Sequence, residues 1–186
     1  MGTKLKIRTL DSRIPTPEFK NIPRAPITVI LDNLRSAFNV GSIIRTSDCA
    51  LVKKVIMCGI TAHPPHKKLH KTAVGTLDYV DCEYEPFLID AVKKQKRQGI
   101  PVVALETTNK SKIIWDFKFP FPVSIILGNE ALGISRNILE WVDDIIEIPM
   151  LGLKNSINVA VAYGIVVSEI QRQNWKIYPR KTCLTK

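Results

Sequence analysis

The sequence predicts an α/β domain whose mostly parallel sheet is flanked by helices. Short, almost entirely apolar runs at residues 27–31 and 123–127 are typical of strands buried on both faces of a sheet. Helix-length amphipathic segments separate these runs, and strands that alternate with helices indicate parallel pairing. With 186 residues and no internal repeats, the chain is long enough for one such domain with a sizeable core.

The first half of the chain contains the first strands and a helix. Residues 1–26 hold four prolines and little periodicity, so we expect an extended arm over the surface. Apolar runs then predict strands at 27–31 and 54–58, separated by a helix over 39–51. Val40, Ile43, Ile44 and Leu51 are expected to face the sheet from this helix. Residues 61–71 follow as a basic loop.

The second half continues the same alternation. An amphipathic helix is predicted over 87–98, with its cations late, where they suit the helix dipole, and Gly99 as its stop. Ser135 is a candidate cap for a short helix that reaches residue 141. The predicted strands are 79–84, 101–105, a short edge strand at 113–115, a central strand at 123–127, and 145–148.

The last predicted helix is unusually apolar. Ten of the fourteen residues from 157 to 170 are apolar and Glu169 is the only charge, while Asn155 or Ser156 is the expected N-cap. Two apolar rows on one helix imply burial on two sides. One face is expected to pack on the sheet and the other on a second subunit, which predicts a homodimer. The rows are Ile157, Val161 and Ile165, and Val159, Ala162, Val166 and Ile170.

The net charge of +10 is concentrated at the two ends of the chain. Residues 1–26 carry six Lys/Arg against two acidic residues, residues 171–186 carry five against none, and the middle carries sixteen against fifteen. Binding to a polyanion, with nucleic acid as the leading candidate, explains this distribution better than a need for solubility does. Solvated basic tails without a partner are the alternative. We therefore expect a basic N-terminal arm (1–26), a folded domain (27–172) and a basic C-terminal tail (173–186).

The cysteines and the first residues of the chain favour a cytoplasmic protein. Cys49, Cys58, Cys82 and Cys183 are scattered, with no Cys-x-x-Cys pair, so free thiols in a reducing compartment are expected. The first residues lack the apolar run of a signal peptide. The last helix is too short and too interrupted to cross a membrane.

Common nucleotide-binding motifs are absent from the sequence. No two of the nine glycines are two residues apart, which excludes the Gly-x-Gly-x-x-Gly fingerprint. Gly128 and Gly133 have the outer spacing of a Walker A loop, but Ile134 stands where the phosphate-binding Lys must be. The histidines of the basic loop lack a helical or strand register that would aim them at a metal. We expect that loop to face the substrate and to contact phosphates through His66, Lys67, Lys68 and Lys71.

Three segments together resemble a known family. Asn39-Val-Gly-Ser-Ile-Ile-Arg45-Thr, Ile126-Leu-Gly128-Asn-Glu130-Ala-Leu-Gly133-Ile-Ser135 and Ile148-Pro-Met-Leu-Gly-Leu-Lys-Asn-Ser156-Ile-Asn158-Val are similar, in this order, to the three motifs of the SpoU (TrmH) family of SPOUT-superfamily RNA ribose methyltransferases. The resemblance implies methyl transfer from S-adenosylmethionine to a ribose 2′-hydroxyl of RNA, without a metal. It also implies a homodimer and a C-terminal trefoil knot, which connections in proteins otherwise avoid.

The resemblance also implies roles for individual residues. The cofactor-binding residues would be Leu105, Gly128, Ile148, Leu153 and Ile157. The catalytic residues would be Arg45, Asn39, Glu130, Ser156 and Asn158. A guanidinium stays protonated in proteins, so we expect Arg45 to grip a phosphate and stabilise the developing alkoxide rather than to remove the proton. Each of these residues also has a purely structural alternative. Arg45 could form a surface ion pair with Asp48. Glu130 could be an acid at a helix start, Ser156 an N-cap, and Asn158 a polar residue of a first helical turn.

Two other functions remain open from the sequence. One is a catalytically silent RNA-binding protein of the same fold. The other is a SPOUT enzyme that methylates a base. The sequence leaves open whether the RNA is tRNA or ribosomal RNA.

Overall fold

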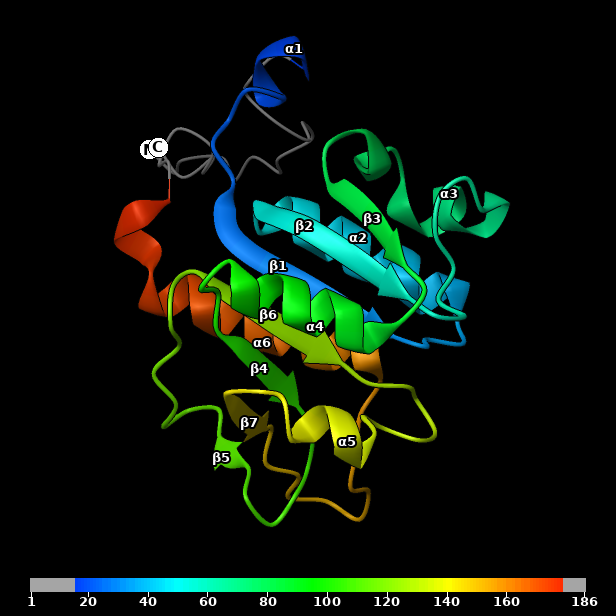
Figure 1. The fold of residues 1–186 in the computed structure, drawn as a ribbon. Coiled ribbons are helices and arrows are strands. Elements are labelled where there is room, and N and C mark those ends of the chain that lie inside the picture. Colours follow the sequence, from blue (N-terminus) through cyan, green and yellow to red (C-terminus); the bar gives the residue numbers. More distant parts are fainter. Residues whose placement is uncertain (1–15, 179–186) are drawn as a thin grey trace, which may run out of the picture.

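A computed structural model describes residues 16–178, and their strands form one parallel sheet. In this part of the chain seven strands lie in the order β3-β2-β1-β6-β4-β7-β5, and every neighbouring pair is parallel (Figure 1). This confirms the predicted fold class apart from the knot. The strands are β1 (Ala25–Asp32), β2 (Val52–Cys58), β3 (Asp81–Glu85), β4 (Val102–Leu105), β5 (Lys112–Ile113), β6 (Val123–Leu127) and β7 (Asp144–Glu147).

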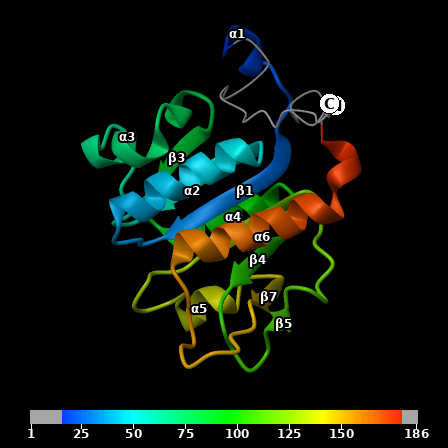
Figure 2. The same ribbon diagram turned by 180° about the vertical axis from the view of Figure 1, so that it is seen from behind.

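Helices cover both faces of the sheet. Two of them, α2 and α6, lie on one face, and α4 and α5 lie on the other (Figures 1 and 2). The helices are α1 (Thr16–Phe19), α2 (Ala37–Cys49), α3 (Lys67–Ala73), α4 (Leu88–Arg97), α5 (Arg136–Leu139) and α6 (Val159–Gln173), with 3-10 turns η1 (Thr76–Asp78) and η2 (Trp175–Ile177). Among the residues described, no helix combines the length and apolarity that a bilayer span needs.

The sheet has β6 at its centre, although β6 comes late in the sequence. All five residues of β6 are buried, as predicted for a central strand. It pairs with β1 on one side and β4 on the other. Because all the strands are parallel, their carboxyl ends lie at one edge of the sheet, where ligands bind in open α/β folds.

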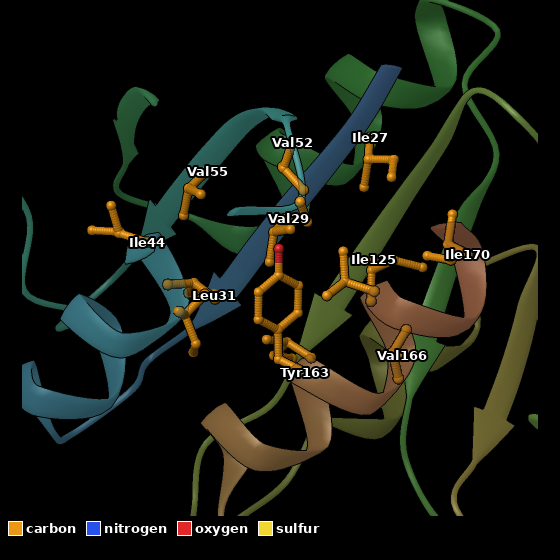
Figure 3. Packing of buried hydrophobic residues seen from close by; sticks show 14 of the residues in the cluster. Ile27, Val29, Leu31, Ile44, Val52, Val55, Ile125, Tyr163, Val166 and Ile170 are labelled. Carbon is orange, nitrogen blue, oxygen red and sulfur yellow. The ribbon is translucent and has the colours of Figure 1, made fainter. Parts of the chain in front are cut away.

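The larger core lies between the sheet and the helices α2 and α6. The Tyr163 ring points from α6 toward β1 and β6, where Val29, Leu31 and Ile125 surround it (Figure 3). The hydroxyl groups of Tyr163 and Ser47, both fully buried, are 2.7 Å apart and form a hydrogen bond between α6 and α2. A buried hydroxyl without a partner is costly, so this pair fixes how the two helices face each other.

The basic loop predicted for residues 61–71 is partly helical. Its second half belongs to α3, where Leu69 and Ala73 are fully buried one helical turn apart and pack into the core with α2. A Cβ at Gly41 on α2 would lie 1.9 Å from the Thr72 Oγ1 atom. Close packing of α3 on α2 therefore requires a glycine at this position.

The described part of the N-terminal arm lies on the domain, as predicted, but it includes one helical turn and is not extended throughout. Thr16–Phe19 forms one helical turn, and the Phe19 ring packs edge-on against Tyr79. Arg24 forms an ion pair with Asp48 on α2 at 2.8 Å. Residues 1–15 and 179–186 of the predicted arm and tail lie outside the described residues, and the proposed domain boundaries stay a prediction.

The last helix begins later than predicted. Its N-cap is Asn158, whose side-chain oxygen accepts hydrogen bonds from the amides of Ala160 and Val161, so the assignment of the cap to Asn155 or Ser156 was wrong. Of the two apolar rows, Ala162, Val166 and Ile170 are buried in the core. The other row stays accessible in this single chain, with Ile157 39% and Val161 55% exposed.

Two of the cysteines are free thiols away from the cavity described below. Burial, with a smaller effect from nearby carboxylates, raises the pKa of the Cys58 thiol to about 12. Burial likewise raises the pKa of Cys82 to about 11. Both thiols are therefore protonated and unreactive at neutral pH. Cys183 lies outside the described residues.

Candidate functional site

A cavity of about 820 Å³ opens at the carboxyl edge of the sheet. The loops after β4, β6 and β7 and the first turn of α6 form its walls. This volume lies in the range of small-molecule and cofactor sites. The predicted residues that line it are Leu105, Gly128, Glu130, Ile148, Ser156, Ile157 and Asn158.

Glycines allow the loop after β6 to fold tightly against itself. A Cβ at Gly128 would lie 2.7 Å from the carbonyl carbon of Gly133 and 2.8 Å from the amide of Ile134, closer than backbone atoms tolerate. Gly133 has a φ of +66°, and a Cβ there would lie 2.5 Å from the Glu106 carboxylate. Both positions therefore need glycine, the second also for its left-handed backbone.

Glu106 joins the loop after β4 to the loop after β6. Its Oε2 atom accepts a hydrogen bond from the Ile134 amide at 2.8 Å, and its Oε1 atom accepts one from the Thr107 amide at 3.0 Å. The same side chain lines the cavity. The sequence analysis did not single out Glu106, although it is the first polar residue after a buried strand.

The Glu130 carboxylate binds the segment before α2. It accepts hydrogen bonds from the amides of Arg35 at 2.9 Å and Ser36 at 3.3 Å, and from the Asn39 side-chain amide at 3.0 Å. Burial acts to raise the pKa of this carboxyl, but the hydrogen bonds outweigh it and hold the pKa below its ordinary value. Glu130 is therefore an anion at neutral pH and a fixed acceptor.

Asn39 and Asn158 complete a chain of hydrogen bonds across three distant segments. The Asn158 side-chain amide donates to the Asn39 Oδ1 atom at 3.1 Å, while Asn39 itself donates to Glu130. Ser36, not Asn39, is the N-cap of α2, since its hydroxyl accepts the Asn39 amide hydrogen bond at 3.3 Å. Asn39 thus lies in the first turn and links the loop after β6 to the start of α6.

Asn129 forms a second link between the loop after β6 and the end of β1. Its side-chain amide donates to the Asn33 carbonyl at 2.6 Å, and its Oδ1 atom accepts the amides of Ala131 and Leu132. The sequence analysis missed this role. An Asn directly after a glycine at a strand end is the signal that was available.

Three residues predicted for catalysis or cofactor binding, Asn39, Leu153 and Arg45, do not line the cavity of this chain, although Asn39 is hydrogen-bonded to two residues that do. Leu153 is 99% exposed in the loop before α6, between the lining residues Met150 and Asn155 in sequence, but is not itself part of the lining. Arg45 is exposed on α2, six residues after Asn39, which is about 9 Å along the helix axis. The suggested ion pair of Arg45 with Asp48 was wrong, because Asp48 pairs with Arg24. The roles of Leu153 and Arg45 stay predictions.

The residues predicted to contact RNA are exposed around the start of α3. His66, Lys67, Lys68 and Lys71 are all accessible to solvent. His66 also accepts the Lys68 amide hydrogen bond through its Nδ1 atom at 3.3 Å. Within residues 16–178, no group of three His, Cys, Asp or Glu residues is placed to hold a metal ion. The His70 side chain is outside the described part of the chain.

Comparison with known proteins relates the chain to one family. The model of the SpoU rRNA Methylase family matches residues 26–168. The tRNA (guanosine(18)-2′-O)-methyltransferase of Thermus thermophilus is 30% identical over 150 residues, which are 81% of this chain and 76% of that protein.

Solved structures show the same fold. The Aquifex structure described as the A. aeolicus TrmH/SpoU tRNA modifying enzyme matches with a TM-score of 0.78 and 27% identity, over 86% of this chain and 82% of that one. An AdoMet-bound rRNA methyltransferase from Sinorhizobium meliloti matches with a TM-score of 0.74 and 27% identity. That match covers 83% of this chain but 59% of the Sinorhizobium chain.

Proposed function

Because the chain belongs to the SpoU rRNA Methylase family, we propose that it transfers a methyl group from S-adenosylmethionine to a ribose 2′-hydroxyl of RNA. The observation that carries this proposal is the cavity, since segments of the second and third sequence motifs line it and Asn39 of the first is hydrogen-bonded to two of its residues. The Thermus relative is named as a 2′-O-methyltransferase of tRNA, and the Sinorhizobium structure contains AdoMet.

The lining of the cavity fits S-adenosylmethionine. Leu105, Ile148 and Ile157 provide apolar surface for an adenine ring, while the tight turn at Gly128 leaves backbone groups accessible beside it. Glu106 and Asn155 add polar groups that suit ribose and amino-acid atoms. Leu153, in the adjacent exposed loop, would cover the bound cofactor.

The chemistry requires positioning and the loss of one proton. When bound, S-adenosylmethionine supplies an electrophilic methyl group, whose bond to sulfur breaks as a bond to the ribose 2′-oxygen forms. The hydrogen-bonded chain of Glu130, Asn39 and Asn158 holds the walls of the cavity at fixed positions, so that the two reactants meet in line. Ser156 lines the same wall and would orient the ribose.

Arg45 would complete the site from a second copy of the chain. Its guanidinium has no ion-pair or hydrogen-bond partner among residues 16–178 and is open to solvent. In a homodimer through α6, the Arg45 of one protomer would grip an RNA phosphate beside the cavity of the other. It would stabilise the developing alkoxide, while the proton leaves through that phosphate or water.

The same proposal includes the assembly and the topology. The exposed Ile157 and Val161 support a homodimer through the last helix, although Ile165, the third member of the row, is partly buried against the core. The likeness to SpoU structures supports a trefoil knot formed by the C-terminal segment. A cytoplasmic location stays a prediction, and the RNA substrate is tRNA or ribosomal RNA.

Analysis of the product RNA tests this function. Purified protein is incubated with methyl-labelled S-adenosylmethionine and RNA from cells that lack the protein, and the RNA is digested with nuclease. Label should appear in a nuclease-resistant dinucleotide, because a 2′-O-methyl group blocks cleavage at its own linkage. Label in a mononucleotide, which nuclease releases when the ribose is unmodified, would favour the base-methylating alternative. Failure to bind S-adenosylmethionine in a titration would favour the silent RNA-binding protein.

A further inference from the structure

A cluster of exposed aromatic and apolar side chains lies at the carboxyl ends of β2 and β3, away from the cavity. Tyr84 on β3 is 42% exposed, and Phe87, just after this strand, is 66% exposed. Ile60, just after β2, is 71% exposed. None of the three lines the cavity, and the proposed reaction does not use them.

Local contacts hold the Tyr84 ring in a fixed orientation. The His63 ring stacks on it, with centroids 4.1 Å apart and planes 30° apart. The Tyr84 hydroxyl donates to the Gly59 carbonyl at 3.2 Å. The His63 Nδ1 atom lies 3.0 Å from the Pro64 carbonyl, which can only accept, so this nitrogen is the donor. The Tyr84 ring is exposed but already held by the stacked His63 ring and by the hydrogen bond of its hydroxyl. Little further side-chain conformational entropy is therefore lost when a ligand stacks on it.

The surroundings of the ring are suited to RNA. His66, Lys67, Lys68 and Lys71 are exposed on the same loop and helix that supply His63. Glu83, the nearest acid on β3 in sequence before Tyr84, forms ion pairs with Lys54 and Lys94. Glu85, like Glu83, is on the face of the sheet opposite Tyr84, because successive side chains of a strand alternate, so phosphates are expected to lie toward α3 and a base toward the ring.

The Tyr84 ring and the cavity are close enough for one RNA strand to contact both. Both lie at the carboxyl edge of one parallel sheet, where β3 is three strands from β6. Neighbouring strands are about 4.8 Å apart, so this offset is roughly 14 Å. That distance is about four stacked nucleotides at roughly 3.4 Å each, and fewer nucleotides of an extended strand.

We propose that Tyr84, backed by His63, is a stacking platform for an unpaired base of the RNA substrate, a few nucleotides from the ribose at the cavity. This inference rests on the proposed function only for the identity of the neighbouring site. Aromatic rings bind single-stranded RNA in this way without reading a particular sequence. Phosphates of the same strand would contact Lys67, Lys68 and Lys71.

Binding measurements on the full-length protein test the platform. The probe is a fluorescein-labelled single-stranded RNA of about 12 nucleotides. Tyr84→Ala and Tyr84→Leu should each weaken binding about tenfold, while Tyr84→Phe, which keeps the ring, should stay within about twofold of wild type. Trp115→Ala is the matched control, since Trp115 is 54% exposed beside β5 at the opposite side of the sheet.

The salt dependence separates stacking from charge. Stacking releases no counterions, so Tyr84→Ala should leave the slope of log affinity against log salt unchanged, while Lys67→Ala should reduce it by about 0.7. A 2-aminopurine base in the probe should lose fluorescence on binding to wild type but not to Tyr84→Leu.

Several results would overturn the platform. These are unchanged RNA affinity in Tyr84→Ala and Tyr84→Leu, an equal loss in Tyr84→Phe, or a change of oligomeric state instead of affinity, which would make this surface a contact with a second copy. If wild type binds the probe and shows these differences but transfers no methyl group, the platform stands and the proposed function fails. If wild type methylates RNA but Tyr84→Ala and Tyr84→Leu bind the probe as wild type does, the proposed function stands and the platform fails.

Discussion

Gly128 lies at the point where the loop after β6 turns back on itself. A methyl group there would meet the backbone of Gly133 and Ile134, which cannot move aside as a flexible side chain can. Gly128→Ala should therefore destabilise the protein by about 1–3 kcal/mol and weaken S-adenosylmethionine binding. Thermal unfolding and calorimetric titration measure both effects. In Gly152→Ala, where a Cβ meets no atom within 4 Å, neither quantity should change, and equal effects in the two variants would contradict this account.

Arg45 is the residue whose role depends most on a second copy. Arg45→Lys keeps the charge but loses the planar fork that binds a phosphate through two parallel hydrogen bonds. We expect turnover to fall about 100-fold, in the range seen when one transition-state donor is lost, with S-adenosylmethionine affinity unchanged. Arg97→Lys, on an exposed end of α4, is the control. Turnover near the wild-type value in Arg45→Lys would remove Arg45 from the reaction.

At the scale of elements, one buried hydrogen bond sets how α2 and α6 face each other. Tyr163→Phe would leave the Ser47 hydroxyl buried without this partner, and should lower the free energy of unfolding by about 1–2 kcal/mol. Ser47→Ala should cost a similar amount. The double variant should cost clearly less than the sum, because neither hydroxyl is then stranded. Chemical denaturation of the three variants measures the coupling, and strictly additive costs would show that the bond contributes nothing.

Local patterns in the sequence located the strands well and the helix ends poorly. The bounds of β6 were predicted correctly because the strand is buried on both faces, so all its residues form one short run that ends where burial ends. The start of α6 was wrong because Asn155, Ser156 and Asn158 all carry good capping groups. The contact that distinguishes Asn158 comes from Asn39, which is 119 residues away. Similarly, α3 was missed because its helical face is defined by packing on α2, not by a long periodic segment.

In the candidate site too, local patterns predicted some residues, and contacts between distant segments determined the others. Residues at or just after strand ends, such as Leu105, Gly128 and Ile148, line the cavity because parallel strands bring their carboxyl ends to one edge, while their cofactor-binding roles stay predictions. Glu106 and Asn129 act through bonds to other loops, which periodicity does not reveal. Arg45 is proposed to act at the cavity of a second copy, and patterns within one chain do not predict such a placement.

At the scale of the whole molecule, the accessible row on α6 is expected to hold two copies together. Val161→Glu places a charge in the middle of this row, where Val161 is 55% exposed in the single chain. Burying an unpaired charge is costly, so the variant should be a monomer by light scattering at micromolar concentration, while wild type is a dimer. Ile113→Glu, at the far side of the sheet, should leave the dimer intact. A monomeric wild type would contradict the assembly.

The late position of β6 in the sequence has a consequence for synthesis of the protein. On the ribosome, β1, β2 and β3 emerge first, yet β1 can reach β4 only through β6, which begins at Val123. The nascent chain therefore carries an open strand edge on β1 until β6 has been made. The bond from Asn158 to Asn39 forms later still, so the pocket is finished only after residue 158 has left the ribosome.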